Sequence, residues 1–208
     1  MKFKRTSEEQ RKIIINGTRH LVAVGGMNNF SYPKLMAETG INAPAVYELY
    51  KDKADLLTSC FLDIDAEIGN TIGAILKKAP PHRDDPKAID NYCWILWSTY
   101  WNYLISDTER THFYWSFYHS EYFTNVLTPR HRKNFKAFLK FVEELDKRFQ
   151  LSLRHNRYAL VNNLIDGTIS SAIRILDGEY EDTDITVHTI YRMLFQPVFL
   201  ALGIDPPL

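Results

Sequence analysis

The sequence divides into segments of helical length that are separated by a few short breaks rich in Pro, Gly and Asp. No segment keeps the two-residue alternation of apolar and polar side chains that a half-buried strand requires. The chain is therefore expected to be all-α. Helices are predicted over residues 7–24, 32–38, 43–49, 53–78, 87–105, 108–122, 130–153, 157–177 and 184–202.

Several of these segments begin with residues that satisfy the free N–H groups of a first helical turn. Ser7 with Gln10 three residues later has the pattern of a capping box. Ser31 precedes Pro33, and Asn42 precedes Pro44, so each pair combines a capping side chain with a proline that fits the first turn. Asp52 is placed to open the long fourth helix.

The composition indicates a soluble globular protein. With 208 residues, 45% of them apolar, the chain can bury a sizeable core. Its two cysteines, Cys60 and Cys93, are too few for a disulfide framework and are interpreted as buried apolar side chains. The longest apolar uncharged run, 91–106, is shorter than a membrane span. No signal peptide is recognised, so a cytoplasmic location is expected.

The charges are balanced over the whole chain but not along it. Residues 1–60 hold nine basic and six acidic side chains, a net charge of +3, and the remainder has a net charge of −3. A basic N-terminal part on a mildly acidic body suggests an anionic partner at that end.

Residues 7–49 hold three helices, and Gly40 separates the second from the third, which is the helix-turn-helix pattern. Their apolar residues are spaced to pack the two short helices on the first: Ile14, Ile15, Leu21 and Val22 on one side, and Leu35, Ile41, Val46 and Tyr50 on the other. The third helix would then expose small residues near its start, which allows close approach to base edges in the major groove. Any small helical hairpin shares part of this pattern.

The predicted DNA contacts combine a basic N-terminal arm with the starts and exposed faces of these helices. Cations there would neutralise phosphates, and helix N-termini would add backbone donors. The predicted residues are Lys4, Arg5, Ser31, Tyr32, Lys34, Asn42, Ala43, Ala45, Tyr47, Lys51 and Lys53.

The run from residue 31 to 57, SYPKLMAETGINAPAVYELYKDKADLL, resembles the DNA-binding signature of the TetR family of repressors. Ser31 matches the hydroxyl residue that caps the second helix, Gly40-Ile41 the turn, and Val46-Tyr47 the aliphatic-Tyr pair of the recognition helix. Lys53 followed by Leu56-Leu57 matches the start of the fourth helix. Gly26 stands where the family has the Gly that ends its first helix.

The resemblance covers about the first 60 residues and implies a two-part architecture. Residues 1–52 would form the DNA-binding domain, and residues 53–208 a helical bundle for ligand binding and dimerisation. The sequence departs from the family pattern at Met36, where a small Ala is usual, and at Glu48, an acid on the recognition helix. Ala43 offers no hydrogen bond to a base, so the operator sequence is not predicted.

All four tryptophans lie between residues 92 and 123, a segment that also holds many tyrosines and phenylalanines. They either fill a solid core or line a ligand cavity, in which Trp and Tyr need partners for their N–H and O–H groups. The resemblance implies a small-molecule site in this body. The predicted ligand-binding residues are Trp94, Trp97, Tyr100, Trp101, His112, Phe113, Trp115, Phe117 and Tyr118.

The sequence leaves the ligand open. Nearby acids would suit a planar or cationic molecule through cation–π contact, and a neutral lipophilic molecule fits nearly as well. Glu109 and His112 have the spacing of metal ligands, but a second such pair is lacking, so no metal and no cofactor are predicted. No nucleophile motif or phosphate-binding glycine loop supports an enzyme.

Two apolar helices end the chain, and the resemblance implies that residues 157–202 pair with a second copy. Two recognition helices would then contact a palindromic operator. The favoured hypothesis is a repressor that a small hydrophobic, aromatic or cationic effector releases by swinging helix 53–78. Three alternatives remain: a DNA-binding regulator with a filled core that a protein partner controls, an enzyme in a helical bundle, and a purely structural helical dimer.

Overall fold

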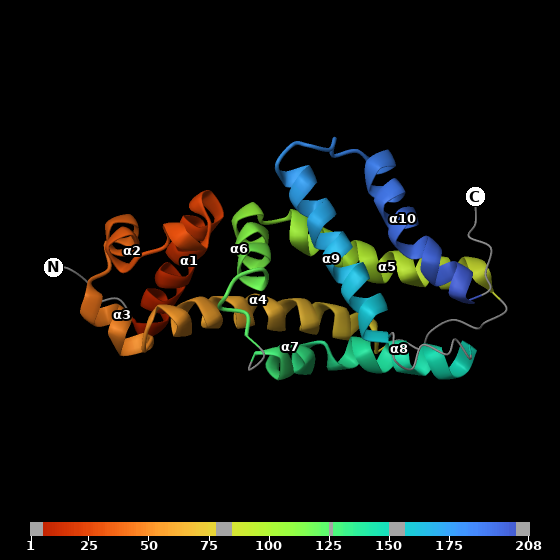
Figure 1. Ribbon diagram of the computed structural model, residues 1–208, viewed down its shortest axis with the longest axis horizontal. Coiled ribbons are helices and arrows are strands. Elements are labelled where there is room, and N and C mark those ends of the chain that lie inside the picture. The colour runs from red at the N-terminus through yellow and green to blue at the C-terminus, as the bar shows by residue number, and fades with distance from the viewer. Residues whose placement is uncertain (1–5, 78–84, 125–126, 150–156, 203–208) are drawn as a thin grey trace. The chain divides into compact units, whose positions relative to one another are not determined.

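A computed structural model describes residues 6–77, 85–124, 127–149 and 157–202, and every regular element in these ranges is helical (Figure 1). The all-α prediction is confirmed. The elements are α1 (Ser7–Gly25), the 3₁₀ turn η1 (Met27–Asn29), α2 (Tyr32–Thr39), α3 (Ala43–Leu49), α4 (Lys53–Ile75), α5 (Pro86–Ile105), α6 (Thr108–Tyr118), α7 (Thr128–Asn134), α8 (Lys136–Phe149), α9 (Arg157–Leu176) and α10 (Asp184–Leu202).

Three details of the predicted helices were wrong. The cap of α1 is Thr6, whose side chain forms the capping box with Glu9, and not Ser7. The helix predicted over 108–122 ends at Tyr118, because the Ser120 hydroxyl and amide both donate to the Phe117 carbonyl and close a turn. The single helix predicted over 130–153 is two helices, α7 and α8, which meet at the buried Phe135. Residues 78 and 150–153, the predicted ends of two helices, lie outside the described ranges.

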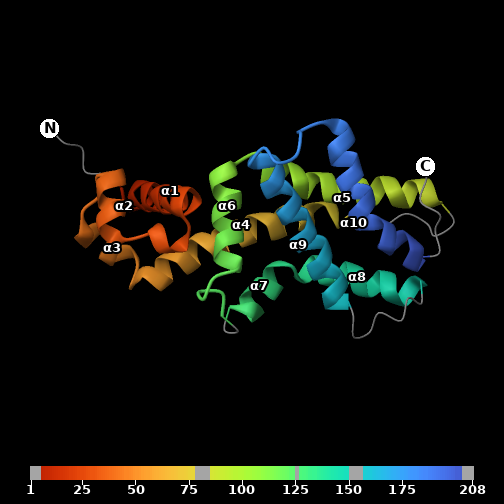
Figure 2. The ribbon, with the colours of Figure 1, turned by 45° about the horizontal axis from the view of Figure 1, so that its top comes forward.

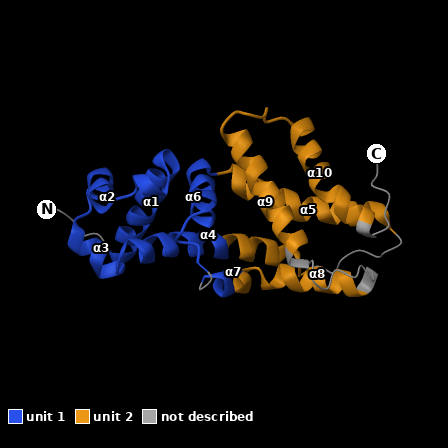
Figure 3. Cartoon of the chain, viewed as in Figure 1, with its two compact units in different colours: residues 1–66, 107–131 blue, residues 67–106, 132–208 orange. Residues whose placement is uncertain are grey.

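The chain forms two compact units (Figure 3). Unit 1 contains residues 1–66 and 107–131, and unit 2 contains residues 67–106 and 132–208. Helix α4 contributes residues 53–66 to unit 1 and residues 67–75 to unit 2. Helix α6 packs against α1 and so belongs to the same unit as the N-terminal helices. The predicted functional boundary after residue 52 stays a prediction.

Unit 1 is built on α1, against which α2, α3 and α6 pack (Figure 2). Seven of the eight apolar residues predicted for this contact are buried, and Leu21 is only partly buried. The seven are Ile14, Ile15, Val22, Leu35, Ile41, Val46 and Tyr50. At the crossing with α2, Gly17 faces Thr39, and a Cβ at Gly17 would lie closer to the Thr39 side chain than real Cβ atoms approach. In the same unit, the Phe61 ring of α4 stacks on Tyr114 and Phe117 of α6.

Unit 2 is built around α5, which contacts α9, and α9 contacts α8 and α10. Its core is aromatic, with Trp97 stacked on Trp101 and Tyr191 tilted against Phe195. Cys93 of this unit and Cys60 of unit 1 are buried, and burial raises the pKa of each thiol to about 12. Both therefore behave as the apolar side chains that the sequence predicts. Among the described residues, no helix has the length and hydropathy of a membrane span.

Candidate functional site

The α2–α3 hairpin of unit 1 is closed by local side-chain chemistry. The Ser31 hydroxyl accepts from the Lys34 amide and caps α2, and the Asn42 side chain accepts from the Ala45 amide and caps α3. Gly40 ends α2 with φ 65° and ψ 15°, a left-handed conformation that favours glycine. Its amide donates to the Met36 carbonyl. These bonds fix the angle at which α3 leaves α2.

The outer face of α3 is open to solvent. Tyr47 is 57% exposed, and Asn42 and Glu48 are also exposed, while Val46 of the same helix is buried. The Tyr47 ring meets the edge of the Tyr32 ring at a centroid distance of 5.3 Å. Burial raises the pKa of Tyr32 to about 12, so this phenol stays neutral at physiological pH. Helix α3 thus presents a projecting tyrosine beside the small, half-buried Ala43 and Ala45.

The predicted cations of this surface differ in how they are held. Lys51 is exposed, and the ammonium of Lys34 contacts the side-chain oxygen of Asn29. The Lys53 ammonium donates to the Phe30 carbonyl at 3.1 Å and lies over the Phe30 ring. Lys53 therefore joins the start of α4 to the residue before the α2 cap. The predicted arm residues Lys4 and Arg5 lie outside the described ranges.

Two polar contacts hold α1 in this unit. The Arg11 guanidinium donates to both Asp63 carboxylate oxygens, at 2.9 and 3.2 Å, which links α1 to α4. The His20 imidazole lies 2.7 Å from a Glu109 carboxylate oxygen of α6 and 3.9 Å from Glu38 of α2. The hydrogen bond to Glu109 raises the pKa of His20. Sequence reasoning did not assign these contacts, because they join residues far apart in the chain.

The predicted ligand-binding residues fall into two groups that belong to different units. His112, Phe113, Trp115, Phe117 and Tyr118 lie on α6 in unit 1, where Phe113 and Phe117 are fully buried and stacked on each other. The remaining four, Trp94, Trp97, Tyr100 and Trp101, lie on α5 in unit 2.

Trp97 and Tyr100 line a small apolar cavity in unit 2, with a volume of about 40 Å³. The Trp97 indole N–H donates to the Thr168 hydroxyl at 3.0 Å, and that hydroxyl donates to the Leu164 carbonyl. The lining residues are Ile72, Leu96, Trp97, Tyr100, Phe138, Leu164, Ile165, Thr168 and Phe195, none of them charged.

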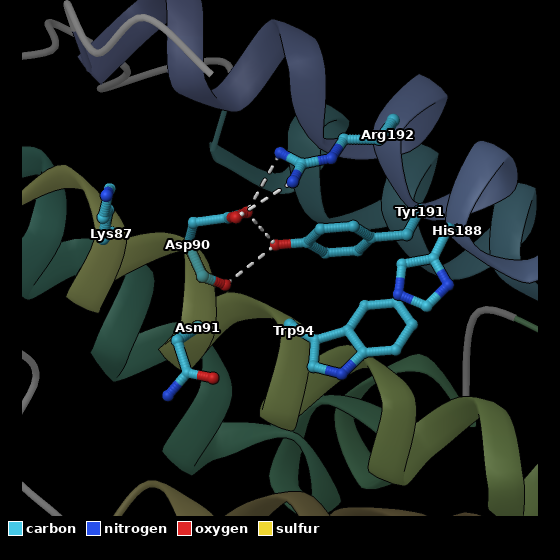
Figure 4. A pocket seen from close by; sticks show the side chains of 7 residues that line it. All are labelled: Lys87, Asp90, Asn91, Trp94, His188, Tyr191 and Arg192. Atoms are coloured by element: carbon cyan, nitrogen blue, oxygen red, sulfur yellow. Dashed lines mark hydrogen bonds and ion pairs between the residues drawn. The ribbon is translucent and has the colours of Figure 1, made fainter. Parts of the chain in front are cut away.

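Trp94 belongs to a second, larger pocket of unit 2, between α5 and α10 (Figure 4). Its volume is about 270 Å³, and its lining is polar: Lys87, Asp90, Asn91, Trp94, His188, Tyr191 and Arg192. Sequence reasoning assigned only Trp94 to a ligand site. The other residues carried no signal, because Asp90 and Arg192 are 102 positions apart in the chain.

Among the described residues, no group of three or more His, Cys, Asp or Glu side chains is arranged to hold a metal ion. In particular, Glu109 contacts His20, and that pair acts as a link between helices.

No protein-family model and no curated protein sequence matches the chain. Several solved structures do match it. A TetR family transcription regulator from Marinobacter aquaeolei VT8 has 19% sequence identity and a TM-score of 0.75, over 90% of this chain and 94% of that chain. A TetR-like transcriptional regulator from Rhodococcus sp. RHA1 has 10% identity and a TM-score of 0.65, over 94% and 98% of the two chains.

The transcriptional regulator FadR from Bacillus subtilis, solved in complex with stearoyl-CoA, is also similar, with 12% identity and a TM-score of 0.62. The match covers 88% of this chain and 96% of FadR. These similarities extend over nearly the whole of each chain. The chain therefore has the fold of the TetR-family transcription regulators.

Proposed function

We propose that this chain is a TetR-family transcription regulator that binds duplex DNA through α2 and α3. The exposed face of α3 is the observation that carries the proposal. An aromatic side chain projects there beside two alanines, on a helix whose position is fixed by two capped starts and a left-handed turn. A short helix with small residues at its start fits the width of the major groove. Lys34, Lys51 and Lys53 supply cations around it for phosphate contacts.

Substitution of Tyr47 tests the DNA-binding proposal. Duplexes that the protein enriches from fragments of its own genome are titrated by fluorescence anisotropy. Tyr47→Ala should lower the affinity by about tenfold, because one base-edge contact is lost. Tyr180→Ala is the matched control, since Tyr180 is also exposed but belongs to unit 2. If thermal melts show that both proteins are folded and they bind DNA with equal affinity, Tyr47 of α3 does not contact the DNA.

Effector control belongs to the same proposal: the protein represses from a palindromic operator, and a small molecule bound in unit 2 releases it. Helix α4 supports this coupling, because it begins at Lys53 beside α2 and continues to Ile72, which lines the apolar cavity. That cavity has no charged lining residue, which favours a neutral lipophilic molecule over a cation. At about 40 Å³ it lies far below the roughly 300 Å³ of a typical ligand pocket, so such a ligand must displace the walls.

The small volume of this cavity also favours a second candidate, a DNA-binding regulator whose filled core is controlled by a protein partner. Decanol and tetraphenylphosphonium separate the two. Decanol that raises the melting temperature and lowers DNA affinity supports the apolar effector, and Trp97→Ala should alter that response. If neither compound changes the melting temperature or DNA binding, the apolar cavity is not an effector site.

A further inference from the structure

The polar pocket between α5 and α10 lies beside the apolar cavity, and its chemistry is different. Four of its seven lining residues come from the first half of α5: Lys87, Asp90, Asn91 and Trp94. The other three, His188, Tyr191 and Arg192, come from the first half of α10 (Figure 4). The volume of about 270 Å³ is nearly seven times that of the apolar cavity and approaches the range of small-molecule sites.

A hydrogen-bonded network makes one wall of this pocket rigid. The Arg192 guanidinium donates to both oxygens of the Asp90 carboxylate, at 3.1 and 3.3 Å. The Tyr191 hydroxyl donates to the Asp90 carboxylate at 2.9 Å and lies 3.0 Å from the Asp90 carbonyl. Burial raises the pKa of Tyr191, so the phenol remains a donor. Asp90 and Arg192 neutralise each other, and together they leave no net charge at the wall.

The remaining charge in the pocket is the ammonium of Lys87. Its side chain is exposed and forms no ion pair among the described residues. The pocket therefore carries one uncompensated positive charge. A singly charged anion matches this charge. A doubly charged phosphate would leave one negative charge uncompensated next to the Asp90 carboxylate.

Two further groups are placed to contact a planar ligand. His188 Nδ1 lies 2.8 Å from the Asp184 carbonyl, which only accepts, so Nδ1 carries a hydrogen and Nε2 remains for another partner. The His188 ring stacks on Trp94 at a centroid distance of 4.3 Å and an angle of 19°. The Asn91 amide completes the polar lining. The site thus combines one cation with aromatic surface and neutral hydrogen-bonding groups.

Tyr191, which lines the polar pocket, packs on residues that line the apolar cavity. The Tyr191 ring contacts Trp94 at 5.1 Å and Trp97 at 5.4 Å between centroids, and it packs on Phe195 at 4.7 Å. Trp97 and Phe195 line the apolar cavity. A ligand that moves Trp94 or Tyr191 therefore acts directly on the residues around that cavity.

We propose that the pocket between α5 and α10 binds a small planar monocarboxylate, whose carboxylate pairs with Lys87 and whose ring lies against Trp94. The site is the entry point of the effector, and in this respect the inference rests on the proposed function. Tyr191 of this pocket contacts Trp97 and Phe195 of the apolar cavity, so a carboxylate recognised here acts on the same core. The carboxylate supplies a partner for Lys87, which has none among the residues that the structure describes.

Isothermal titration calorimetry with benzoate tests the site, with benzamide as the neutral compound of the same shape. The protein should bind one benzoate per chain and should not bind benzamide. Lys87→Met should weaken benzoate binding by about tenfold, the effect of losing one hydrogen bond to a charged group. Lys136→Met is the matched control, because Lys136 is an exposed lysine in the first turn of α8 with no ion pair among the described residues.

A second variant has the opposite expected sign. Asp90→Asn keeps an oxygen that accepts from Tyr191 but removes the charge that neutralises Arg192. Benzoate should then bind several times more tightly, provided that the thermal melt shows a folded protein. The proposed carboxylate site is contradicted if benzoate does not bind at about 10 mM, a concentration that reveals millimolar affinity. It is equally overturned if benzamide binds as well as benzoate, or if Lys87→Met binds benzoate unchanged.

DNA titrations of the same samples keep the two proposals apart. If the protein binds benzoate but no DNA, the ligand-site proposal is supported and the proposed regulator function is contradicted. If the protein binds DNA but not benzoate, the ligand-site proposal is contradicted and the proposed regulator function is supported. If both occur, benzoate should lower the affinity for DNA in the unaltered protein but not in Lys87→Met.

Discussion

At the scale of single residues, the lysines around α2 and α3 have two roles. Lys53 donates to the Phe30 carbonyl, and its ammonium lies over the Phe30 and Tyr122 rings, at 5.6 and 5.7 Å from their centroids. It holds together the helices that carry the recognition surface. Lys51, two positions earlier, is exposed, and its ammonium has no ion pair among the residues that the structure describes.

Substitution of these two lysines should therefore have different consequences. Lys53→Met should lower the free energy of unfolding by about 1 kcal/mol, because a buried carbonyl loses its donor. Lys51→Met should leave unfolding unchanged and lower the slope of log affinity against log salt by about 0.9, the loss of one phosphate contact. Urea unfolding and DNA titrations at several salt concentrations measure the two effects. Identical unfolding curves for Lys53→Met and the unaltered protein would show that the Phe30 contact contributes nothing.

His20 is a second residue whose contact has a measurable consequence. Its pKa is raised by the hydrogen bond to Glu109, so the folded protein binds the proton more strongly than the unfolded chain. The stabilisation is fully present below the ordinary value of 6.5 and is lost as the pH rises through the raised pKa. The pair is exposed to solvent and screened, so we expect only a few tenths of a kcal/mol.

His20→Gln should thus destabilise the protein at about pH 5.5 and match it at about pH 9, well above the ordinary histidine pKa. His119→Gln is the control, since the His119 imidazole contacts the Trp115 carbonyl and no carboxylate among the described residues. Urea unfolding at both pH values measures the difference. A His20→Gln effect of the same size at both would contradict the role of Glu109.

At the scale of elements, two glycines of α4 meet different neighbours. A Cβ on Gly69 would lie against the backbone carbonyl of Asn134, closer than real Cβ atoms approach. A Cβ on Gly73, one turn later, would meet only the Ala137 methyl at 3.8 Å, an ordinary contact. The end of α7 therefore rests directly on the backbone of α4 at Gly69.

The two glycines predict opposite effects on stability. Gly69→Ala should lower the free energy of unfolding by about 1–3 kcal/mol, because α7 must shift. Gly73→Ala should raise it by about 0.5–1 kcal/mol, the gain in helix propensity over glycine. Urea unfolding distinguishes them. A neutral or stabilising Gly69→Ala would mean that α4 and α7 are farther apart than the structure shows.

The helices that sequence reasoning placed correctly have their signals in local chemistry. Ser31, Asn42 and Gly40 act through bonds within four residues, so their roles can be deduced without the tertiary structure. The break between α7 and α8 falls instead where Asn134 lies against Gly69, more than 60 positions away, a contact that the local sequence does not indicate. The polar pocket was missed for the same reason, because its network joins Asp90 to Tyr191 and Arg192.

The aromatic residues show a further limit of periodicity. Spacing places Trp94, Trp97 and Trp101 on one face of α5, yet they have different surroundings. Trp97 lines the apolar cavity, Trp94 lines the polar pocket, and Trp101 stacks on Trp97 in the core. The three side chains differ in burial and in their contacts with α9 and α10. Neither the burial nor these contacts can be deduced from the residue pattern of α5 alone.

At the scale of the whole molecule, α10 presents an apolar stripe to solvent. Ile185, Met193 and Leu200 are 81%, 70% and 62% exposed and recur on one side of the helix. Such a stripe typically marks an interface. It supports the proposed pairing of residues 157–202 with a second copy, which would bring two recognition helices to one operator.

A charge placed on this stripe should separate the two copies. Met193→Asp should sediment as a monomer at concentrations where the unaltered protein is a dimer, because the carboxylate would lose its water at the interface. Val24→Asp is the control, since Val24 is 72% exposed on α1 in unit 1. Sedimentation velocity measures both. A dimeric Met193→Asp would place the interface elsewhere, and a monomeric unaltered protein would contradict the pairing itself.

The central claim, that this chain recognises a specific duplex, is tested most directly by footprinting. The full-length protein is incubated at about 150 mM salt with genomic fragments and a large excess of random duplex, conditions that suppress binding through phosphates alone. The account predicts one protected site with two symmetric halves about one helical turn apart. The account is contradicted if the excess of random duplex abolishes protection on every genomic fragment.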